Sequence, residues 1–232
     1  MTVPNQDYRY EIKFVLDEAE FAKALSWLYA CTSACVAHPA RTVNSVYFDD
    51  PGYSSVRDNL AGISERCKIR LRWYHDADRN NINDAKLEVK YRKGRLGHKD
   101  RYSLSGLEKD LLLTEYRDLF PYVHTYLGGD DVFVIEDHLS PTLHVSYRRE
   151  YFEGLNGIRV TFDRPIMFYS PLAHSRPFED ISVSYPHTIM EIKFAPEQKD
   201  DVSNSLCHLN LTPKRHSKYL VGLAAFGQAI YY

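Results

Sequence analysis

Lysine and arginine residues recur at every second position in several segments of the chain. This spacing places side chains on one face of a β-strand. The pattern is densest in the segments 68–72, 86–92 and 99–101, where apolar or aromatic residues occupy most of the positions between the cations. Like charges on neighbouring strands repel, at a cost of roughly 0.2–1 kcal/mol per pair. A bound anion would relieve this repulsion, so the pattern points to a face that binds a polyanion.

The positive charge is local. Residues 65–101 contain twelve Lys or Arg and six Asp or Glu, whereas the chain as a whole has a formal charge of −2. An antiparallel sheet with one face in water also alternates polar and apolar residues. A solvated sheet face therefore remains the alternative to an anion site at this point.

Three glutamates lie within these basic strands, and each stands two residues before a lysine. The three pairs are Glu11 and Lys13, Glu88 and Lys90, and Glu191 and Lys193. Such pairs can form internal salt bridges. Carboxylates next to phosphate-binding cations can instead hold Mg²⁺ or Mn²⁺, which bind carboxylate oxygens together with substrate phosphates.

The elements that would position these residues follow from the periodicity of the chain. Strands are predicted at 8–16, 44–49, 65–75, 85–93, 95–104, 143–152, 158–163 and 188–194, and helices at 17–29, 54–59, 107–126, after Pro196 and from Ser217 onward. Asp17 is a predicted N-cap of the first helix. Seven or eight antiparallel strands with interspersed helices indicate one α+β domain, residues 1–232, with a barrel as one closed form of the sheet.

Other features narrow the function. The aromatic residues Tyr10, Trp73, Tyr91 and Phe162 lie on the strand faces opposite the cations, which disfavours stacking on nucleic-acid bases. Four cysteines are too few for a disulfide scaffold. The sequence shows no leader pattern and no apolar run of membrane-spanning length, so we expect a cytoplasmic protein.

Several motifs resemble a known family. They are the three Glu-x-Lys pairs, the runs 68–74 and 87–90, and the segments Gly97–Arg101, Ser146–Arg149, Arg159–Asp163 and Ser217–Tyr219. Together they resemble the triphosphate tunnel metalloenzymes (CYTH-like proteins), and within them the VTC (vacuolar transporter chaperone) domain of polyphosphate polymerases. The resemblance extends from about Tyr8 to Tyr219.

This resemblance implies an eight-stranded antiparallel β-barrel, the triphosphate tunnel, with helices packed outside. It implies transfer of the γ-phosphate of ATP to a growing polyphosphate chain, with Mn²⁺ or Mg²⁺ as cofactor. The implied catalytic residues are Lys13, Arg70, Arg72, Lys90, Arg149 and Lys193. The implied substrate-binding residues are Lys99, Arg101, Tyr147, Arg159, Ser217 and Lys218. Glu191 would be the principal metal ligand, together with Glu11 and Glu88.

The chain departs from the hydrolase and cyclase branch of that superfamily at its first motif. The first motif of that branch resembles Glu-x-Glu-x-Lys, whereas in this chain Arg9 holds the position of the first glutamate. This favours the polymerase-like branch. Strand parity leaves open whether Arg148 or Arg149 faces the phosphates, because Leu143, Val145, Tyr147 and Arg149 share one face.

The expected ligands are a nucleoside triphosphate and polyphosphate, and nucleic acid is not expected. The chain has no predicted membrane span, and a membrane partner remains open. The alternative functions are an inorganic tripolyphosphatase or nucleoside triphosphatase, and a non-catalytic sensor of polyphosphate or nucleotide.

Overall fold

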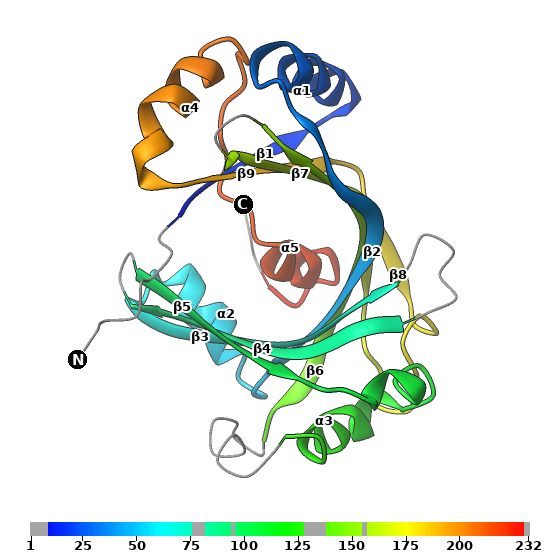
Figure 1. Ribbon diagram of the computed structural model, residues 1–232. Coiled ribbons are helices and arrows are strands. Elements are labelled where there is room, and N and C mark those ends of the chain that lie inside the picture. Colours follow the sequence, from blue (N-terminus) through cyan, green and yellow to red (C-terminus); the bar gives the residue numbers. More distant parts are fainter. Residues whose placement is uncertain (1–8, 76–81, 94–95, 128–137, 155–156, 230–232) are drawn as a thin grey trace, which may run out of the picture. The chain divides into compact units, whose positions relative to one another are not determined.

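The computed structural model describes residues 9–75, 82–93, 96–127, 138–154 and 157–229 (Figure 1). The strands are β1 (Tyr10–Leu16), β2 (Cys35–Asp49), β3 (Glu65–His75), β4 (Ile82–Lys93), β5 (Leu96–Ser103), β6 (Ser140–Glu153), β7 (Arg159–Tyr169), β8 (Ser182–Tyr185) and β9 (Thr188–Phe194). The helices are α1 (Glu18–Cys31), α2 (Ser54–Leu60), α3 (Tyr116–His124), α4 (Lys199–Leu206) and α5 (Lys218–Ala225), with 3₁₀ turns η1 (Leu107–Lys109) and η4 (Pro196–Gln198).

The chain forms two compact units. The first contains residues 1–41, 147–166 and 185–216, and the second contains residues 42–146, 167–184 and 217–232. Hydrogen bonding gives the strand order β1-β9-β7-β6-β2-β3-β4-β5, and β8 pairs with β7. Strands β2, β6, β7 and β8 contribute residues to both units. The prediction of one domain stays a prediction.

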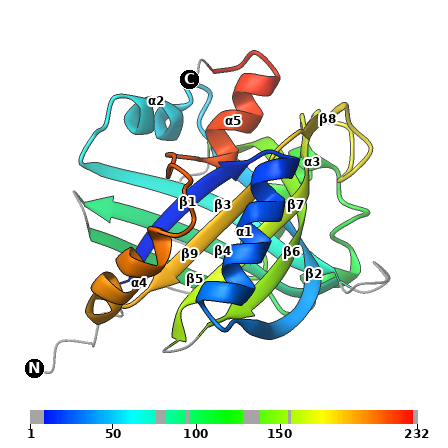
Figure 2. The same cartoon turned by 90° about the horizontal axis from the view of Figure 1, so that it is seen from above.

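In the first unit, β9 pairs antiparallel with β1 on one side and with β7 on the other. Alternate residues of these strands, such as Phe14, Phe162 and Ile192, point to a core that includes Trp27 and Leu28 of α1 and Val202 of α4. Figure 2 shows both helices lying over these strands. A capping box at the start of α1 fixes its entry, because Asp17 and Glu20 bond to each other's backbone N–H groups. The charged strand residues consequently share the opposite face.

In the second unit, β3 pairs with β2 and β4, and β4 pairs with β5, all antiparallel. The apolar residues of these strands, among them Leu71, Trp73 and Leu87, pack against α3 and the segment before it. The C-terminal helix α5 packs on the other face, where Tyr219 stacks on Tyr47 with ring centroids 4.7 Å apart. Figure 1 shows α3 and α5 on opposite sides of β3 and β4.

The antiparallel α+β class predicted from the sequence is confirmed, and most strands lie where alternation placed them. Several details differ. Strand β7 continues to Tyr169, and β8 lies where no strand was predicted. The predicted helix 107–126 is a 3₁₀ turn followed by the shorter α3, and Pro121 lies inside that helix. Strand β2 begins at Cys35, nine residues before the predicted start. Helix α5 packs on the charged face, whereas the resemblance implied helices packed outside the barrel.

Part of the sequence prediction lies outside the described residues. This applies to Tyr8 at the start of the first strand, to most of the predicted loop after His75, and to Gly94 in the predicted turn that follows β4. Lys93 and Leu96, on either side of that turn, are the last and first described residues.

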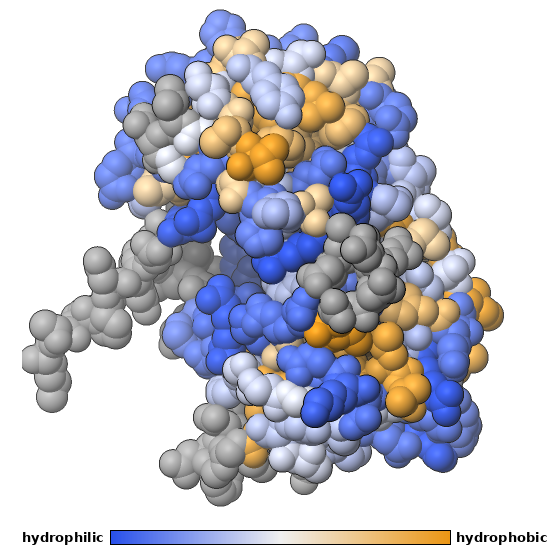
Figure 3. Space-filling model, turned by 45° about the vertical axis from the view of Figure 1, so that its right-hand side comes forward, coloured by the Kyte–Doolittle hydropathy of each residue, from blue (hydrophilic) through white to orange (hydrophobic). Residues whose placement is uncertain are grey.

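The surface is mostly hydrophilic on the face drawn in Figure 3, with apolar side chains gathered in several places. Exposed apolar residues of the chain include Tyr29, Val36, Leu113, Leu172 and Ile181. Among the described residues, no helix has the length and apolar character needed to cross a membrane.

Candidate functional site

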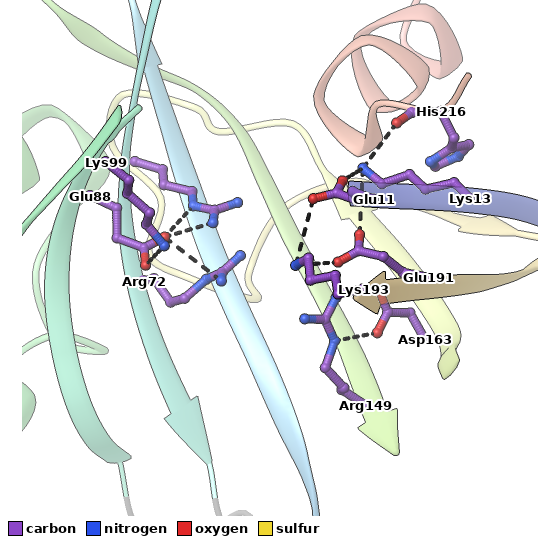
Figure 4. A network of polar contacts seen from close by, with 11 residues as sticks. Glu11, Lys13, Arg72, Glu88, Lys99, Arg149, Asp163, Glu191, Lys193 and His216 are labelled. Carbon is purple, nitrogen blue, oxygen red and sulfur yellow. Dashed lines mark hydrogen bonds and ion pairs between the residues drawn. The ribbon is translucent and has the colours of Figure 1, made fainter. Parts of the chain in front are cut away.

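Two glutamates, Glu11 and Glu191, and two lysines, Lys13 and Lys193, form a small polar cluster in the first unit (Figure 4). Lys13 Nζ lies 2.8 Å from Glu11 Oε1 and 3.5 Å from Glu191 Oε2. Lys193 Nζ lies 2.5 Å from Glu191 Oε1 and 3.6 Å from Glu11 Oε2. The strand register explains the arrangement, since Lys13 is paired with Glu191 and Glu11 with Lys193 across β1 and β9. Each lysine therefore contacts both carboxylates.

The charges of this cluster stabilise one another. Burial raises the pKa of Glu191, but the ammonium groups of Lys193 and Lys13 outweigh it and hold this pKa well below its ordinary value. Burial likewise opposes charge on Lys13, yet Glu191 and Glu11 raise its pKa above the usual range. Glu191 is only 7% exposed. Both carboxylates are thus ionised near neutral pH and available as oxygen ligands.

Arg149 adds a further cation to the charged face of the first unit. Its guanidinium donates to both oxygens of Asp163, with Nε 2.6 Å from Oδ1 and a second nitrogen 2.7 Å from Oδ2. The guanidinium carbon also lies 5.2 Å from the centre of the Tyr147 ring. Asp163 is fully buried, whereas Arg148 is exposed. Arg149 is therefore the arginine that belongs to this cluster.

Alternation along β6 left the orientation of Arg149 ambiguous, because the face that carries Arg149 also carries apolar residues. Leu143 lies on the same face of β6, and apolar residues normally point to a core beneath a helix layer. In the second unit α5 supplies that cover on the charged face. A Cβ atom at Gly222 would come within 2.5 Å of Leu143 and 2.8 Å of Phe168. An apolar residue and the arginine bound to Asp163 can therefore share one face of β6.

Glu88 has a different setting in the second unit, where four cations surround it. Arg70 approaches Oε2 at 2.7 Å through Nε and at 2.6 Å through a terminal nitrogen. Arg72 lies 3.7 Å from Oε2, and Arg101 lies 3.8 Å from Oε1. The ammonium of Lys99 also bonds to Oε1. The register places Arg70, Glu88 and Arg101 side by side on β3, β4 and β5.

The excess of cations shifts the pKa values of Glu88 and of the titratable groups next to it. Burial raises the pKa of Glu88, but Arg70 and Arg72 outweigh this effect and hold the pKa well below its ordinary value. Burial and the neighbouring Arg70 lower the pKa of Lys99 to about 7, although Glu88 opposes this. Burial also raises the pKa of Tyr47, yet Arg70 and Arg72 lower it to about 8. One glutamate therefore leaves this cluster strongly positive.

More cations continue this face. Lys68, Lys90 and Lys99 are register partners on three adjacent strands, which places three like charges in one row. The ammonium of Lys68 lies 5.7 Å from the centre of the Tyr219 ring. Such a row is unfavourable without an anion.

Helix α5 brings the last two predicted residues, Ser217 and Lys218, to the second unit. Ser217 is the N-cap of the helix, and its hydroxyl oxygen accepts a hydrogen bond from the backbone N–H of Leu220. Tyr219 anchors the helix to β2 by donating a hydrogen bond of 2.7 Å to Asp49 Oδ2. The hydroxyl hydrogen of Ser217 remains able to donate to a ligand.

The predicted site residues therefore separate into two groups. The first unit contains Glu11, Lys13, Tyr147, Arg149, Arg159, Glu191 and Lys193, and the second contains Arg70, Arg72, Glu88, Lys90, Lys99, Arg101, Ser217 and Lys218. Within each unit, salt bridges join the carboxylates to their cations. The assigned roles of these residues stay predictions.

Sequence reasoning missed four residues of these clusters. Asp163 and Thr161 share the strand face of Arg159, so alternation along β7 was the signal for both. Tyr47 accepts a hydrogen bond from Arg70 at 3.1 Å. Asp49 holds both Tyr219 and the start of α2. Tyr47 and Asp49 stand in a strand with few charges, and sequence alone gave no signal for them.

The residues around Glu191 fit a divalent cation. Within the described ranges, no group of three or more His, Cys, Asp or Glu side chains is arranged to hold a metal ion. Mg²⁺ and Mn²⁺ do not need such a cage, because they commonly take one or two carboxylates and complete their shell with phosphate oxygens and water. Thr161 lies opposite Glu191 across β7 and β9. Its buried hydroxyl has no hydrogen-bond partner in the described part of the chain, which leaves a polar group for such a ligand.

Solved structures share the fold of this chain. The PH1819 protein from Pyrococcus horikoshii OT3 has a TM-score of 0.51 and 12% identity, covering 95% of this chain and 99% of that one. A putative adenylate cyclase from Vibrio parahaemolyticus has a TM-score of 0.50 and 9% identity, covering 94% and 98%. A putative adenylyl cyclase from Hippeastrum, described as having a dominant triphosphatase activity, has a TM-score of 0.50 and 14% identity, covering 94% and 96%.

At these identities the likeness concerns the fold alone, and the predicted fold of the triphosphate tunnel type is confirmed at that level. A search of curated proteins found no match. The model of the VTC domain family matches residues 8–227, nearly the full chain. The protein therefore belongs to the VTC domain family.

Proposed function

We propose that this protein is a metal-dependent phosphotransferase that moves the γ-phosphate of a nucleoside triphosphate onto a growing inorganic polyphosphate chain. The observation that carries the proposal is that one VTC domain contains two kinds of charged cluster, one in each unit. One cluster holds ionised glutamates, Glu11 and Glu191, between lysines. The other holds an excess of cations around Glu88. Phosphoryl transfer needs both kinds of group.

The cation-rich face of the second unit would bind the phosphates. Arg70 and Arg72 offer forked N–H donors that match phosphate oxygens, and Lys90 and Lys99 add compact positive charge. The hydroxyl of Tyr47 and the N-cap hydroxyl of Ser217 are further donors. Binding of a triphosphate would relieve the repulsion among Lys68, Lys90 and Lys99.

The carboxylate cluster of the first unit would hold the metal ion. Glu191 and Glu11 would supply oxygen ligands, and Mn²⁺ or Mg²⁺ bound there would neutralise charge on the transferring phosphoryl group. Lys13, Lys193 and Arg149 would bind and orient phosphate oxygens. Asp163 fixes the Arg149 guanidinium through two hydrogen bonds, so this group needs little reorganisation when charge develops.

A second candidate is hydrolysis of the triphosphate, in which water is the acceptor. It is favoured by the Hippeastrum protein of the same fold, which is described as having a dominant triphosphatase activity. A third candidate is a sensor that binds polyphosphate without turnover. The ionised glutamate pair at Lys13 and Lys193 argues against a purely cationic sensor site.

Incubation of the purified protein with ATP and Mn²⁺, followed by gel separation of the products, distinguishes the three. We expect long polyphosphate. Orthophosphate as the only product would replace the proposal by hydrolysis. Tight tripolyphosphate binding without turnover would replace it by a sensor.

A further inference from the structure

A buried histidine lies in the second unit, outside both charged clusters. His144 of β6 has no solvent exposure. Its ring stacks on that of Tyr169 with centroids 5.0 Å apart, and the ring centroid of Trp73 lies 5.3 Å away. The ring of Phe178 meets it edge-on with centroids 4.8 Å apart. Aromatic rings from β3, β7 and the segment 170–181 therefore enclose the imidazole.

The surroundings of His144 suit the neutral ring. Its Nδ1 lies 3.0 Å from the Tyr116 hydroxyl. Its Nε2 is buried and has no hydrogen-bond partner among the described residues. A charged imidazole donates from both nitrogens, so protonation would leave a buried, charged N–H without an acceptor. Burial and the neighbouring His75 accordingly lower the pKa of His144 to about 3.

Residues 170–181, which we call the strap, cover this histidine on one side. The strap connects β7 to β8, and its residue Phe178 contacts the His144 ring. Phe178 is itself 37% exposed, so the cover at this point is one side chain thick. Its φ of +76° is a left-handed conformation that is unfavourable for a bulky residue. The contacts of the closed strap therefore act against local backbone strain.

Backbone hydrogen bonds hold the strap to the start of α3. The N–H of Tyr116 donates to the carbonyl of Ser175 at 2.9 Å, and the N–H of Arg117 donates to the carbonyl of Ala173 at 3.1 Å. The N-cap residue of α3, Glu115, makes no capping hydrogen bond with its side chain. The strap thus satisfies N–H groups that the first turn of a helix leaves unpaired. These two amides report whether the strap is in place.

The other titratable groups near His144 come from β3, α3, β7 and the strap. They are His75, Tyr116, Tyr169, Glu179 and Asp180. Burial raises the pKa of Asp180. A carboxyl group with a raised pKa binds its proton more readily in the closed form, so Asp180 favours closure as the pH falls. An opening of the strap in acid must therefore come from another group.

We propose that the strap 170–181 is an acid-sensitive cover that opens when His144 takes up a proton. The inference is independent of the proposed phosphoryl transfer. In the open form His144 meets water, and its pKa returns toward the ordinary value of about 6.5. Between pH 6.5 and pH 3 only the open form then binds this proton. The opening equilibrium constant consequently rises as the pH falls, by up to about tenfold per pH unit.

The test is hydrogen exchange of the full chain at pH 7 and pH 5, with the protection of each amide corrected for its intrinsic exchange rate at that pH. The reporters are the N–H groups of Tyr116 and Arg117. The N–H of Leu104, which donates to the carbonyl of Ala85 in the same unit, is the reference for general unfolding.

Two variants assign the effect. His144→Phe keeps an aromatic ring beside Tyr169 and cannot take up a proton. His174→Gln is the matched control, because it removes an exposed histidine from the strap itself. Thermal unfolding at pH 7 checks that both variants fold.

In the unmodified protein we expect the protection of the two reporters to fall about tenfold from pH 7 to pH 5, while that of Leu104 changes less than twofold. His174→Gln should behave in the same way. In His144→Phe the protection of the reporters should change less than twofold. The inference is overturned if the reporters of the unmodified protein keep their protection at pH 5, or if His144→Phe loses as much protection as the unmodified protein.

A second measurement needs no variant. In nuclear magnetic resonance of the protein labelled at its histidine rings, we expect the His144 ring of the closed form to be neutral at pH 5. A protonated His144 ring in a protein whose Tyr116 and Arg117 amides stay fully protected would also overturn the inference.

Discussion

In the first unit each carboxylate of the central cluster is matched by a lysine, whereas in the second unit Glu88 alone faces four cations. The two clusters use the same residue types on the same kind of antiparallel sheet face. In the first, Glu191 contacts Lys13 and Lys193. In the second, Arg70, Arg72, Lys99 and Arg101 share one carboxylate.

This difference separates two roles that Glu-x-Lys spacing alone cannot distinguish. A dication near Glu88 would be repelled by the surrounding guanidinium and ammonium groups. A dication near Glu191 would meet two carboxylates and two lysines, and its phosphate ligands would pair with those lysines. We therefore infer that Glu191 and Glu11 bind metal, while Glu88 holds the phosphate-binding cations in place.

Removal of the Glu191 charge should have the largest effect. We expect Glu191→Gln to lower ATP turnover in Mn²⁺ on the order of 100-fold or more, because the metal loses its principal ligand. Tripolyphosphate binding without metal should stay equal or become tighter, since a negative charge has been removed. Calorimetric binding and product gels measure the two effects. Turnover within a few-fold of the unmodified protein would remove Glu191 from the metal site.

The corresponding change in the second unit should act on stability. Glu88→Gln leaves partly buried cations without their carboxylate, and we expect the free energy of unfolding to fall by about 3 kcal/mol, the lower end of the cost of breaking a buried ion pair. Tripolyphosphate should recover much of this loss by occupying the cation face. Denaturant titrations with and without the anion measure both quantities. Equal losses under the two conditions would show that Glu88 does not balance the phosphate-binding cations.

The Lys99 ammonium gives the second cluster a pH dependence. With a pKa of about 7, Lys99 is charged below neutral pH and loses its proton above it. A bound anion raises this pKa, so binding should be strongest below pH 7 and should weaken by up to about tenfold per pH unit above it.

Lys99→Gln is the control for that profile, because tripolyphosphate itself also titrates. The difference between the metal-free binding profiles of the two proteins isolates the lysine. Parallel profiles from pH 6 to 9 would contradict the lowered pKa.

The helices of the two units pack on different faces of the sheet, and this difference predicts a smaller effect. Helices α1 and α4 cover the apolar face of the first unit, whereas α5 packs on the charged face of the second through Gly222. A Cβ atom there would overlap Leu143 and Phe168. Overpacking costs about 1–3 kcal/mol and exceeds the helix gain from alanine. Gly222→Ala should therefore lower the free energy of unfolding by about 1 kcal/mol, measured in denaturant. An unchanged or higher value would show that α5 is not tightly packed on this face.

Alternation predicted which faces of β1, β3, β4 and β9 are buried, because strongly alternating segments place apolar residues on one side and charged residues on the other. Alternation also placed the charged residues of those strands on one face, whereas their roles came from the family resemblance and stay predictions. The position of α5 did not follow, since its apolar residues fit either face of a sheet.

The choice between Arg148 and Arg149 could not be made from alternation alone. The apolar neighbours of Arg149 suggested a core-facing strand side, and only the cover supplied by α5 resolves the parity. Tyr47 and Asp49 act through contacts with residues distant in the sequence, Arg70 and Tyr219, which periodicity does not report.

The different roles of the two clusters are tested most directly by measuring Mn²⁺ binding with electron paramagnetic resonance in the presence of a non-hydrolysable triphosphate. The unmodified protein, Glu191→Gln and Glu88→Gln are compared at equal triphosphate saturation. We predict that Glu88→Gln keeps the bound Mn²⁺ signal and that Glu191→Gln loses it. Loss of the signal in Glu88→Gln with retention in Glu191→Gln would contradict the account.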